Sequence, residues 1–307
     1  MNLVTMAIAK RMRNPKGDPT ADLTYPPEYD EAKEQVSVTK NLQYPSAHQQ
    51  NFYDLYLPKD GASPCPVVIW VHGGMFIAGT KDGVVNVATM LAARGCAVAA
   101  MDYALAPEAK HPIPALQVQE LYTHLRQQAH GQMDMERMFI AGDSAGALIA
   151  AQFALIETDE AYAKELGTAA VLPKDALKGA ILTCGPYDLP QIRKAENKLL
   201  RFGLRLLGKA LFGGCPWHKS APCKQSVIVD HVTEAYPPVY ITDGNTGSFE
   251  AQGRRLTEAL RTKNVAVRER FFDLEGGAVP HEYLFQLADE KAQLCLGDIM
   301  RFIEIYQ

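Results

Sequence analysis

From residue 65 to its C-terminus the chain alternates short apolar segments with amphipathic ones, and this alternation restricts the fold more than any other feature. The apolar segments are rich in Val, Ile and Ala and are bounded by Gly, Pro, Asp or Asn, which is typical of strands buried on both faces of a sheet. We predict strands at residues 66–71, 97–102, 137–141, 179–184, 239–242 and 265–272. Helices are predicted at residues 83–94, 115–129, 145–156, 250–263 and 290–305. This pattern predicts the α/β class, a mostly parallel sheet covered by helices.

Two stretches interrupt the alternation. Residues 1–50 are polar, with a helix expected at the N-terminus and a hairpin-like region beginning near residue 35. Residues 188–236 contain an amphipathic helix pattern. We therefore predict that residues 1–50 contribute to a cap, that 51–187 and 237–307 form the two parts of one core, and that 188–236 are a cap insertion.

The composition is that of an ordinary soluble globular protein, with 47% hydrophobic residues, 21% charged residues and a formal net charge of -4. No basic run suited to nucleic acid is present, and no apolar run approaches the ~20 residues that span a membrane. At the N-terminus apolar residues precede positive charge, the reverse of a secretory signal, and the six cysteines form no Cys-x-x-Cys pairs. We expect a cytoplasmic protein without a nucleic-acid partner or membrane span, and take a homodimer as the oligomeric hypothesis.

A Gly-Asp-Ser-Ala-Gly turn at residues 142–146 follows a strand pattern and precedes an Ala-rich helix pattern. This order is the signature of a nucleophile elbow, in which the serine is pushed out above the sheet and the glycines avoid collisions with neighbouring backbone. Ser144 is therefore the candidate nucleophile. Turns of this kind also occur as plain connections or phosphate cradles, so the assignment needs a base, an acid and an oxyanion hole.

The first predicted strand of the core ends in His72-Gly73-Gly74. Acyl transfer builds negative charge on a carbonyl oxygen, and glycines let bare backbone N–H groups approach that oxygen. We predict that Gly73 and Gly74 supply two donors of an oxyanion hole and that Ala145, the residue after Ser144, supplies the third. His72 is expected to orient this loop rather than to take protons; a tight turn without a ligand is the alternative.

Four motifs together resemble the hormone-sensitive-lipase branch of the α/β-hydrolases: HGGM at 72–75, YALAPE at 103–108, PIPA at 112–115 and GDSAG at 142–146. The resemblance extends from about residue 66 to the C-terminus. It implies an α/β-hydrolase fold, with an eight-stranded sheet and a helical cap above the catalytic face. The chain departs from the family at Met75, where a glycine is usual, and at Ala104, where an arginine is common.

The general base is expected to be His281, because this fold orders its triad as serine, acid and histidine. Of the eight histidines, only His281 follows the last predicted strand. The remaining histidines apart from His72 are interpreted as surface or cap residues: His48, His111, His124, His130, His218 and His231.

The acid is the position at which the family pattern breaks. Relatives usually carry Gly-x-x-Asp-x-Leu after the corresponding strand, but this chain places Thr246 or Gly247 at the aspartate position. Asp243 and Glu250 flank the gap. We favour Asp243, because the end of a strand holds a side chain rigidly, whereas Glu250 can simply complement a helix N-terminus. The third possibility is that neither Asp243 nor Glu250 reaches His281.

These residues lead to the hypothesis of a serine carboxylesterase: His281 takes the proton of Ser144, which attacks the carbonyl of a small-molecule ester and forms an acyl-enzyme. The resemblance implies short- to medium-chain esters, since a cap limits what enters. No cofactor is expected, and no metal, because no metal-ligand spacing is present. A non-catalytic ligand-binding protein on the same scaffold and an amidase or peptidase with the same triad are the alternatives. The expected apolar pocket consists of Met75, Phe76, Tyr187, Leu200, Phe202 and Leu206.

Overall fold

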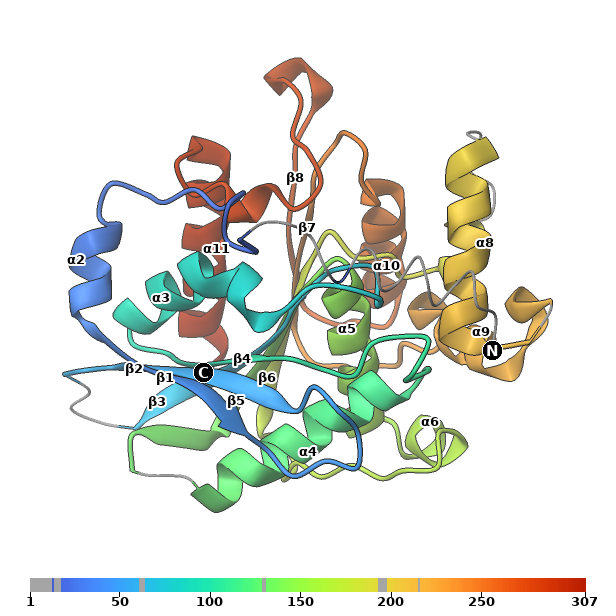
Figure 1. Cartoon of the computed structure of the whole chain (residues 1–307), viewed down its shortest axis with the longest axis horizontal. Coiled ribbons are helices and arrows are strands. Elements are labelled where there is room, and N and C mark those ends of the chain that lie inside the picture. Colours follow the sequence, from blue (N-terminus) through green and yellow to red (C-terminus); the bar gives the residue numbers. More distant parts are fainter. Residues whose placement is uncertain (1–12, 14–17, 61–63, 129–130, 193–197, 215) are drawn as a thin grey trace.

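The computed structural model describes residues 13, 18–60, 64–128, 131–192, 198–214 and 216–307. One sheet of eight strands runs through the molecule in the order β1-β2-β4-β3-β5-β6-β7-β8 (Figure 1). The strands are β1 (Val36–Gln43), β2 (Phe52–Pro58), β3 (Cys65–Val71), β4 (Ala97–Met101), β5 (Met133–Asp143), β6 (Leu177–Thr183), β7 (Val239–Asp243) and β8 (Val267–Phe271). β2 pairs antiparallel with both β1 and β4, and all other pairs are parallel. The α/β fold and its mostly parallel eight-stranded sheet are confirmed.

Helices cover both faces of the sheet (Figure 1). The described α-helices outside residues 188–236 are α2 (Tyr29–Glu34), α3 (Val85–Ala93), α4 (Ile113–Gln128), α5 (Ala145–Thr158), α6 (Glu160–Glu165), α10 (Glu250–Thr262) and α11 (Glu290–Tyr306). Every predicted strand and helix of the core is present, with ends that differ by a few residues. The helix expected at the N-terminus falls on residues that lie outside the described ones.

β3 shows how the two layers are built. All seven of its residues are buried, and alternate side chains point to opposite faces because a strand has a side-chain period of two. Val67, Ile69 and Val71 pack in one hydrophobic cluster with α4, α5 and α10, whereas Val68 and Trp70 pack in a second cluster with α3 and α11. A strand that is apolar on both faces therefore holds the centre of the sheet, and the loop after it is firmly placed.

The described residues of the range 188–236 stand outside the sheet, between β6 and β7. Their described elements are α7 (Leu189–Ile192), α8 (Lys198–Phe212), α9 (Ala221–Gln225) and the 3-10 turns η2 (Trp217–Lys219) and η3 (Ile228–Asp230). The end of α8 is held by a ring stack of Phe212 on Trp217, with centroids 5.8 Å apart. α8, yellow in Figure 1, stands at the edge of the molecule. The division into core and cap stays a prediction.

None of the described helices is both long enough and apolar enough to cross a membrane.

Candidate active site

Parallel strands bring the ends of β3, β5 and β7 to one edge of the sheet, where binding sites of open α/β sheets lie. Ser144 stands between the end of β5 and the start of α5, with φ 49° and ψ -114°. That left-handed backbone is strained for a serine, and strain of this kind is concentrated at active sites. A Cβ on Gly146 would collide with the Val71 carbonyl, and one on Gly142 with the Gly146 carbonyl. The elbow therefore needs both glycines.

His281 meets Ser144 from the other end of the chain. Its Nε2 lies 2.9 Å from Ser144 Oγ, and its ring rests edge-on against Phe249 with centroids 5.4 Å apart. Burial lowers the pKa of His281, and the charge of Glu282 opposes this shift. The imidazole is thus neutral near pH 7, the form in which it accepts a proton.

The third member of the site is arranged differently from the expectation. The Ser248 hydroxyl donates a hydrogen bond to Asp243 Oδ1 and lies 2.6 Å from His281 Nδ1. Asp243 therefore faces the histidine through a serine rather than directly. The rival acid, Glu250, is paired with Arg254 Nη2 at 2.7 Å on its own helix.

Ser248 is a residue that the sequence reasoning missed. That reasoning searched the loop after β7 for a carboxylate, and a serine hydroxyl was not weighed. The available signal was its place directly after Thr246 and Gly247, the two candidates for the position at which relatives carry the acid.

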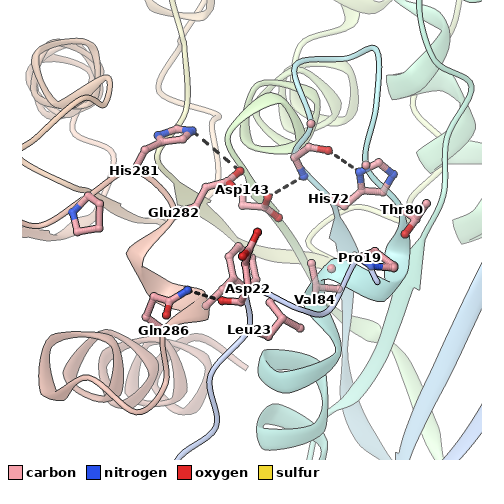
Figure 2. A pocket seen from close by; sticks show the side chains of 16 residues that line it. Pro19, Asp22, Leu23, His72, Thr80, Val84, Asp143, His281, Glu282 and Gln286 are labelled. Atoms are coloured by element: carbon pink, nitrogen blue, oxygen red, sulfur yellow. Dashed lines mark hydrogen bonds and ion pairs between the residues drawn. The ribbon is translucent and has the colours of Figure 1, made fainter. Parts of the chain in front are cut away.

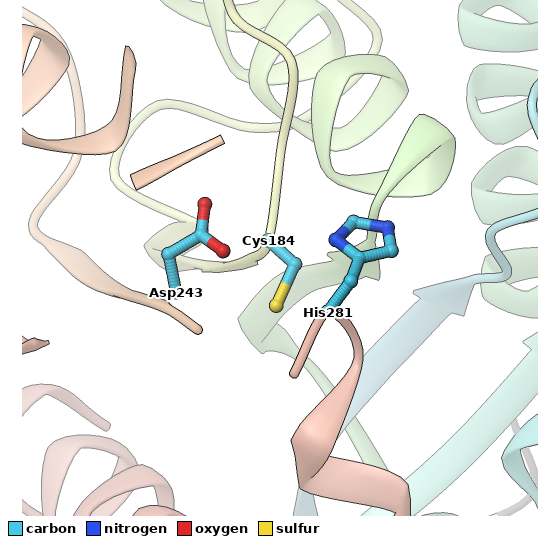
Figure 3. Close-up of side chains that lie close together, drawn as sticks. All are labelled: Cys184, Asp243 and His281. Carbon is cyan, nitrogen blue, oxygen red and sulfur yellow. The ribbon is translucent and has the colours of Figure 1, made fainter. Parts of the chain in front are cut away.

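The buried side chains of Asp243 and Cys184 lie beside His281 (Figure 3). One ligand atom from each of the three side chains lies within 4.8 Å of the others. Burial raises the pKa of Asp243 to about 7, against the hydrogen bond that Ser248 donates. Thiolate, carboxylate and imidazole are ligands that zinc accepts, but here the Ser248 hydroxyl already joins Asp243 to His281.

The oxyanion loop is tied to the elbow by Asp143. Its Oδ2 accepts the Gly73 N–H at 2.6 Å, and its Oδ1 accepts the Trp70 indole N–H at 2.8 Å. Gly73 is thus a correction to the expected set, because its N–H is already used by a buried carboxylate. Gly74, with φ 113°, and Ala145, the first residue of α5, whose N–H has no partner inside the helix, stay the predicted donors.

His72 contacts the backbone of the oxyanion loop and the ring of Tyr103. Its Nδ1 lies 2.5 Å from the Gly73 carbonyl, and its ring stacks on Tyr103 with centroids 4.5 Å apart. Burial lowers the pKa of His72 to about 4, so the ring stays neutral. These contacts agree with the expected orienting role.

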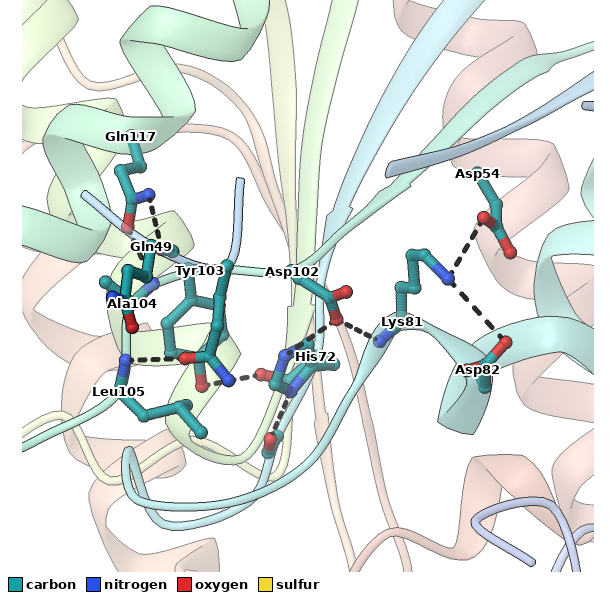
Figure 4. A network of polar contacts seen from close by, with 12 residues as sticks. Gln49, Asp54, His72, Lys81, Asp82, Asp102, Tyr103, Ala104, Leu105 and Gln117 are labelled. Carbon is teal, nitrogen blue, oxygen red and sulfur yellow. Dashed lines mark hydrogen bonds and ion pairs between the residues drawn. The ribbon is translucent and has the colours of Figure 1, made fainter. Parts of the chain in front are cut away.

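A buried ion pair extends this support toward β2 (Figure 4). Lys81 Nζ lies 3.1 Å from Asp54 Oδ1, with the two side chains 4% and 0% exposed. The Lys81 backbone N–H donates to Asp102 Oδ1 at 2.7 Å. The polypeptide that follows the oxyanion loop is therefore fixed to the sheet.

A pocket of about 420 Å³ opens beside the site, between the oxyanion loop, residues 19–23 and residues 280–286 (Figure 2). Gly74 and His281 of the candidate site are among the residues that line it. Its acidic side chains are Asp22, Asp143 and Glu282, with no lysine or arginine among the described residues that line it. Burial, and then the charge of Glu282, raise the pKa of Asp143 well above its usual range, which favours its neutral form. The negative charge of the pocket therefore comes from Asp22 and Glu282.

The apolar pocket expected from the sequence does not coincide with this one. Met75, Phe76, Tyr187 and Leu206 are absent from its described lining. The side chains of Leu200 and Phe202 lie outside the described part of the chain.

Comparisons with known proteins place these features in context. The BD-FAE family model matches residues 53–258. Kynurenine formamidase of Danio rerio is 32% identical over 160 residues, which cover 51% of this chain and 50% of that protein. The chain thus matches about half the length of this curated relative.

Solved structures share the fold. Esterase B from Lactobacillus rhamnosis superposes with a TM-score of 0.80 at 20% identity, covering 99% of this chain and 91% of that chain. A bacterial heroin esterase gives a TM-score of 0.70 at 21% identity, covering 98% and 90%. An esterase of the bacterial hormone-sensitive lipase family gives 0.67 at 16% identity, covering 99% and 96%.

Proposed function

The chain belongs to the BD-FAE family, whose model matches well over half of it, and we propose that it is a serine hydrolase that cleaves carboxylic esters through an acyl-enzyme on Ser144. Family membership and the shared fold agree with the resemblance to hormone-sensitive-lipase-like esterases that the motifs predict. The observation that carries the proposal is the 2.9 Å contact between Ser144 Oγ and His281 Nε2. It joins a strained elbow serine to a neutral, half-buried histidine, as nucleophilic catalysis requires.

The proposed reaction begins when His281 Nε2 takes the Ser144 proton while Oγ attacks the ester carbonyl carbon. The carbonyl oxygen becomes an oxyanion, which the N–H groups of Gly74 and Ala145 stabilise. Collapse of this intermediate breaks the bond to the alcohol oxygen, which takes the proton back from Nε2. Water then repeats the sequence on the acyl-enzyme and releases the carboxylic acid.

The adjoining pocket narrows the substrate class. Asp22 and Glu282 give it negative charge, and a carboxylate on the substrate would be repelled by them. We therefore expect neutral or cationic esters. The modest volume, about 420 Å³, and the cap proposed for residues 188–236 both favour the short to medium acyl chains that the family resemblance implies.

Amide hydrolysis is the second candidate. The relative at 32% identity is named a formamidase, and the same nucleophile, base and oxyanion donors cleave amides. A non-catalytic binding protein is the weaker alternative, since Ser144 and His281 are both present and in contact.

A panel of p-nitrophenyl esters of increasing acyl length, run beside the matching anilides, tests the proposal. We expect turnover of the shorter esters and its loss in Ser144→Ala. Glu250→Gln is the comparison for the rival acid, because this carboxylate is paired with Arg254 on its own helix. Turnover of anilides alone would favour the second candidate, and an active Ser144→Ala enzyme would refute the nucleophile.

A further inference from the structure

Ser248 lies between the acid and the base, and we infer that it is a positioning residue that sets the tautomer of His281 and links the histidine to Asp243. The inference rests on the proposed serine-hydrolase function. In the usual triad an aspartate that contacts the histidine directly holds its tautomer and orientation. We assign that role to the Ser248 hydroxyl.

The direction of each hydrogen bond follows from the chemistry of the groups. An ionised Asp243 can only accept, so the Ser248 hydroxyl donates its proton to Oδ1. The Ser248 oxygen then offers a lone pair to His281 Nδ1, 2.6 Å away, which must carry the hydrogen. Nε2 is left bare toward Ser144. A chain of three hydrogen bonds thus selects the tautomer that can act as a base.

The loop that carries Ser248 is fixed to the loop that carries His281. The Thr246 N–H donates to the Val279 carbonyl at 3.0 Å, and the Asn245 side-chain oxygen accepts the Val279 N–H at 2.8 Å. These contacts lie two or three residues before Ser248 and two residues before His281 in sequence. The spacing between Ser248 and the histidine is therefore supported by contacts outside the hydrogen bonds that join Asp243, Ser248 and His281.

Gly247 precedes Ser248 and is one of the two candidates, with Thr246, for the position of the family acid. It has no side chain, and its φ is 64°. A Cβ built there meets no atom within 4 Å. The carboxylate is instead supplied by buried Asp243 at the end of β7, and a hydroxyl bridges the remaining distance.

Protonation of Asp243 would reverse the direction of the hydrogen bonds from Ser248 to Asp243 and from His281 to Ser248. A neutral carboxylic acid donates a proton to Ser248, which then donates to Nδ1, so that Nε2 carries the hydrogen and cannot receive the Ser144 proton. The titratable groups that face Asp243 are Cys184, Tyr187, Glu250 and, through Ser248, His281. Since burial raises the pKa of Asp243 to about 7, activity should rise as the pH passes through that value.

The test compares Ser248→Ala with Ser248→Thr and with Thr246→Ala. Thr246 is a matched control: its hydroxyl bonds Asn245 Oδ1 at 2.9 Å in the same loop and is exposed. We expect Ser248→Ala to lower kcat by at least about 10²-fold and by up to about 10⁴-fold, the loss that a wrong tautomer causes in a Ser-His-Asp triad. KM should change little, the Asp243-dependent rise in the pH profile should disappear, and Ser248→Thr should restore both.

A second readout does not require turnover. The His281 Nδ1–H should give a strongly downfield-shifted proton NMR signal in the wild type, which Ser248→Ala abolishes and Thr246→Ala retains. A Ser248→Ala enzyme with the wild-type kcat, pH profile and NMR signal would overturn the inference. If instead the wild type hydrolyses no ester or anilide, the proposed function fails, and the NMR comparison still decides whether Ser248 sets the tautomer.

Discussion

Asp143 offers a sharp test of how the elbow and the oxyanion loop support each other. Its carboxylate accepts the N–H of Gly73 and the indole N–H of Trp70, and Trp70 is fully buried. Asp143→Ala leaves both donors without a partner. Each unsatisfied buried donor costs about 1–3 kcal/mol, so the free energy of unfolding should fall by about 2–6 kcal/mol, a large part of the ~5–15 kcal/mol that stabilises a typical domain.

The free energy of unfolding that Asp143→Ala loses should depend on pH. Burial and the charge of Glu282 raise the pKa of Asp143 in the folded state, so the folded protein holds a proton that the unfolded chain has released. The contribution of this group is then fully present below the ordinary aspartate pKa and is lost as the pH rises toward the folded value. Asp143→Ala lacks that slope, and its deficit relative to the wild type should shrink as the pH rises above the ordinary aspartate range.

Urea unfolding at several pH values measures both effects, with Asp143→Asn and Asp22→Ala as comparisons. The asparagine keeps one acceptor and turns an N–H toward the second donor, so its loss should lie between those of the wild type and Asp143→Ala. Asp22 lines the same pocket but is exposed, and its replacement should be nearly neutral. An Asp143→Ala protein as stable as the wild type at every pH would refute this account.

Three further substitutions test other parts of the site. In Gly74→Ala the new Cβ would collide with the Ala78 carbonyl and displace the backbone N–H proposed as an oxyanion donor. The substitution should therefore lower kcat by about 10²–10³-fold, the effect of losing one such donor. Steady-state kinetics measures this loss, and a circular dichroism spectrum distinguishes it from unfolding. Lys81→Met should reduce the free energy of unfolding by about 3–5 kcal/mol by leaving buried Asp54 unpaired, and adding Asp54→Leu should recover much of the loss in urea unfolding. Glu250→Gln should leave kcat unchanged on the best ester, and a large loss would return this residue to consideration as the acid.

The sequence was sufficient for the features that depend on local pattern. Strands and helices of the core follow from hydrophobic periodicity, and the elbow at Ser144 follows from a five-residue motif whose glycines are required by contacts with adjacent backbone. The contact of His281 with Ser144 could be anticipated because this fold places the base in the last loop. A homodimer and a cytoplasmic location stay predictions.

The features that the sequence did not provide depend on contacts between distant segments. Whether the Gly73 N–H is available is decided by the Asp143 carboxylate, which belongs to another strand. The bridging role of Ser248 is decided by a separation between β7 and the loop of His281 that no spacing in the sequence encodes. A search for a carboxylate alone could not find it.

The open space at Gly247 leaves room for a second carboxylate in this loop. A change to aspartate there places a side chain where nothing obstructs its first carbon, at a φ that aspartate tolerates better than most residues. Adding Gly247→Asp to a Ser248→Ala enzyme would therefore show whether a carboxylate one residue before Ser248 can replace the acid that the serine connects to His281.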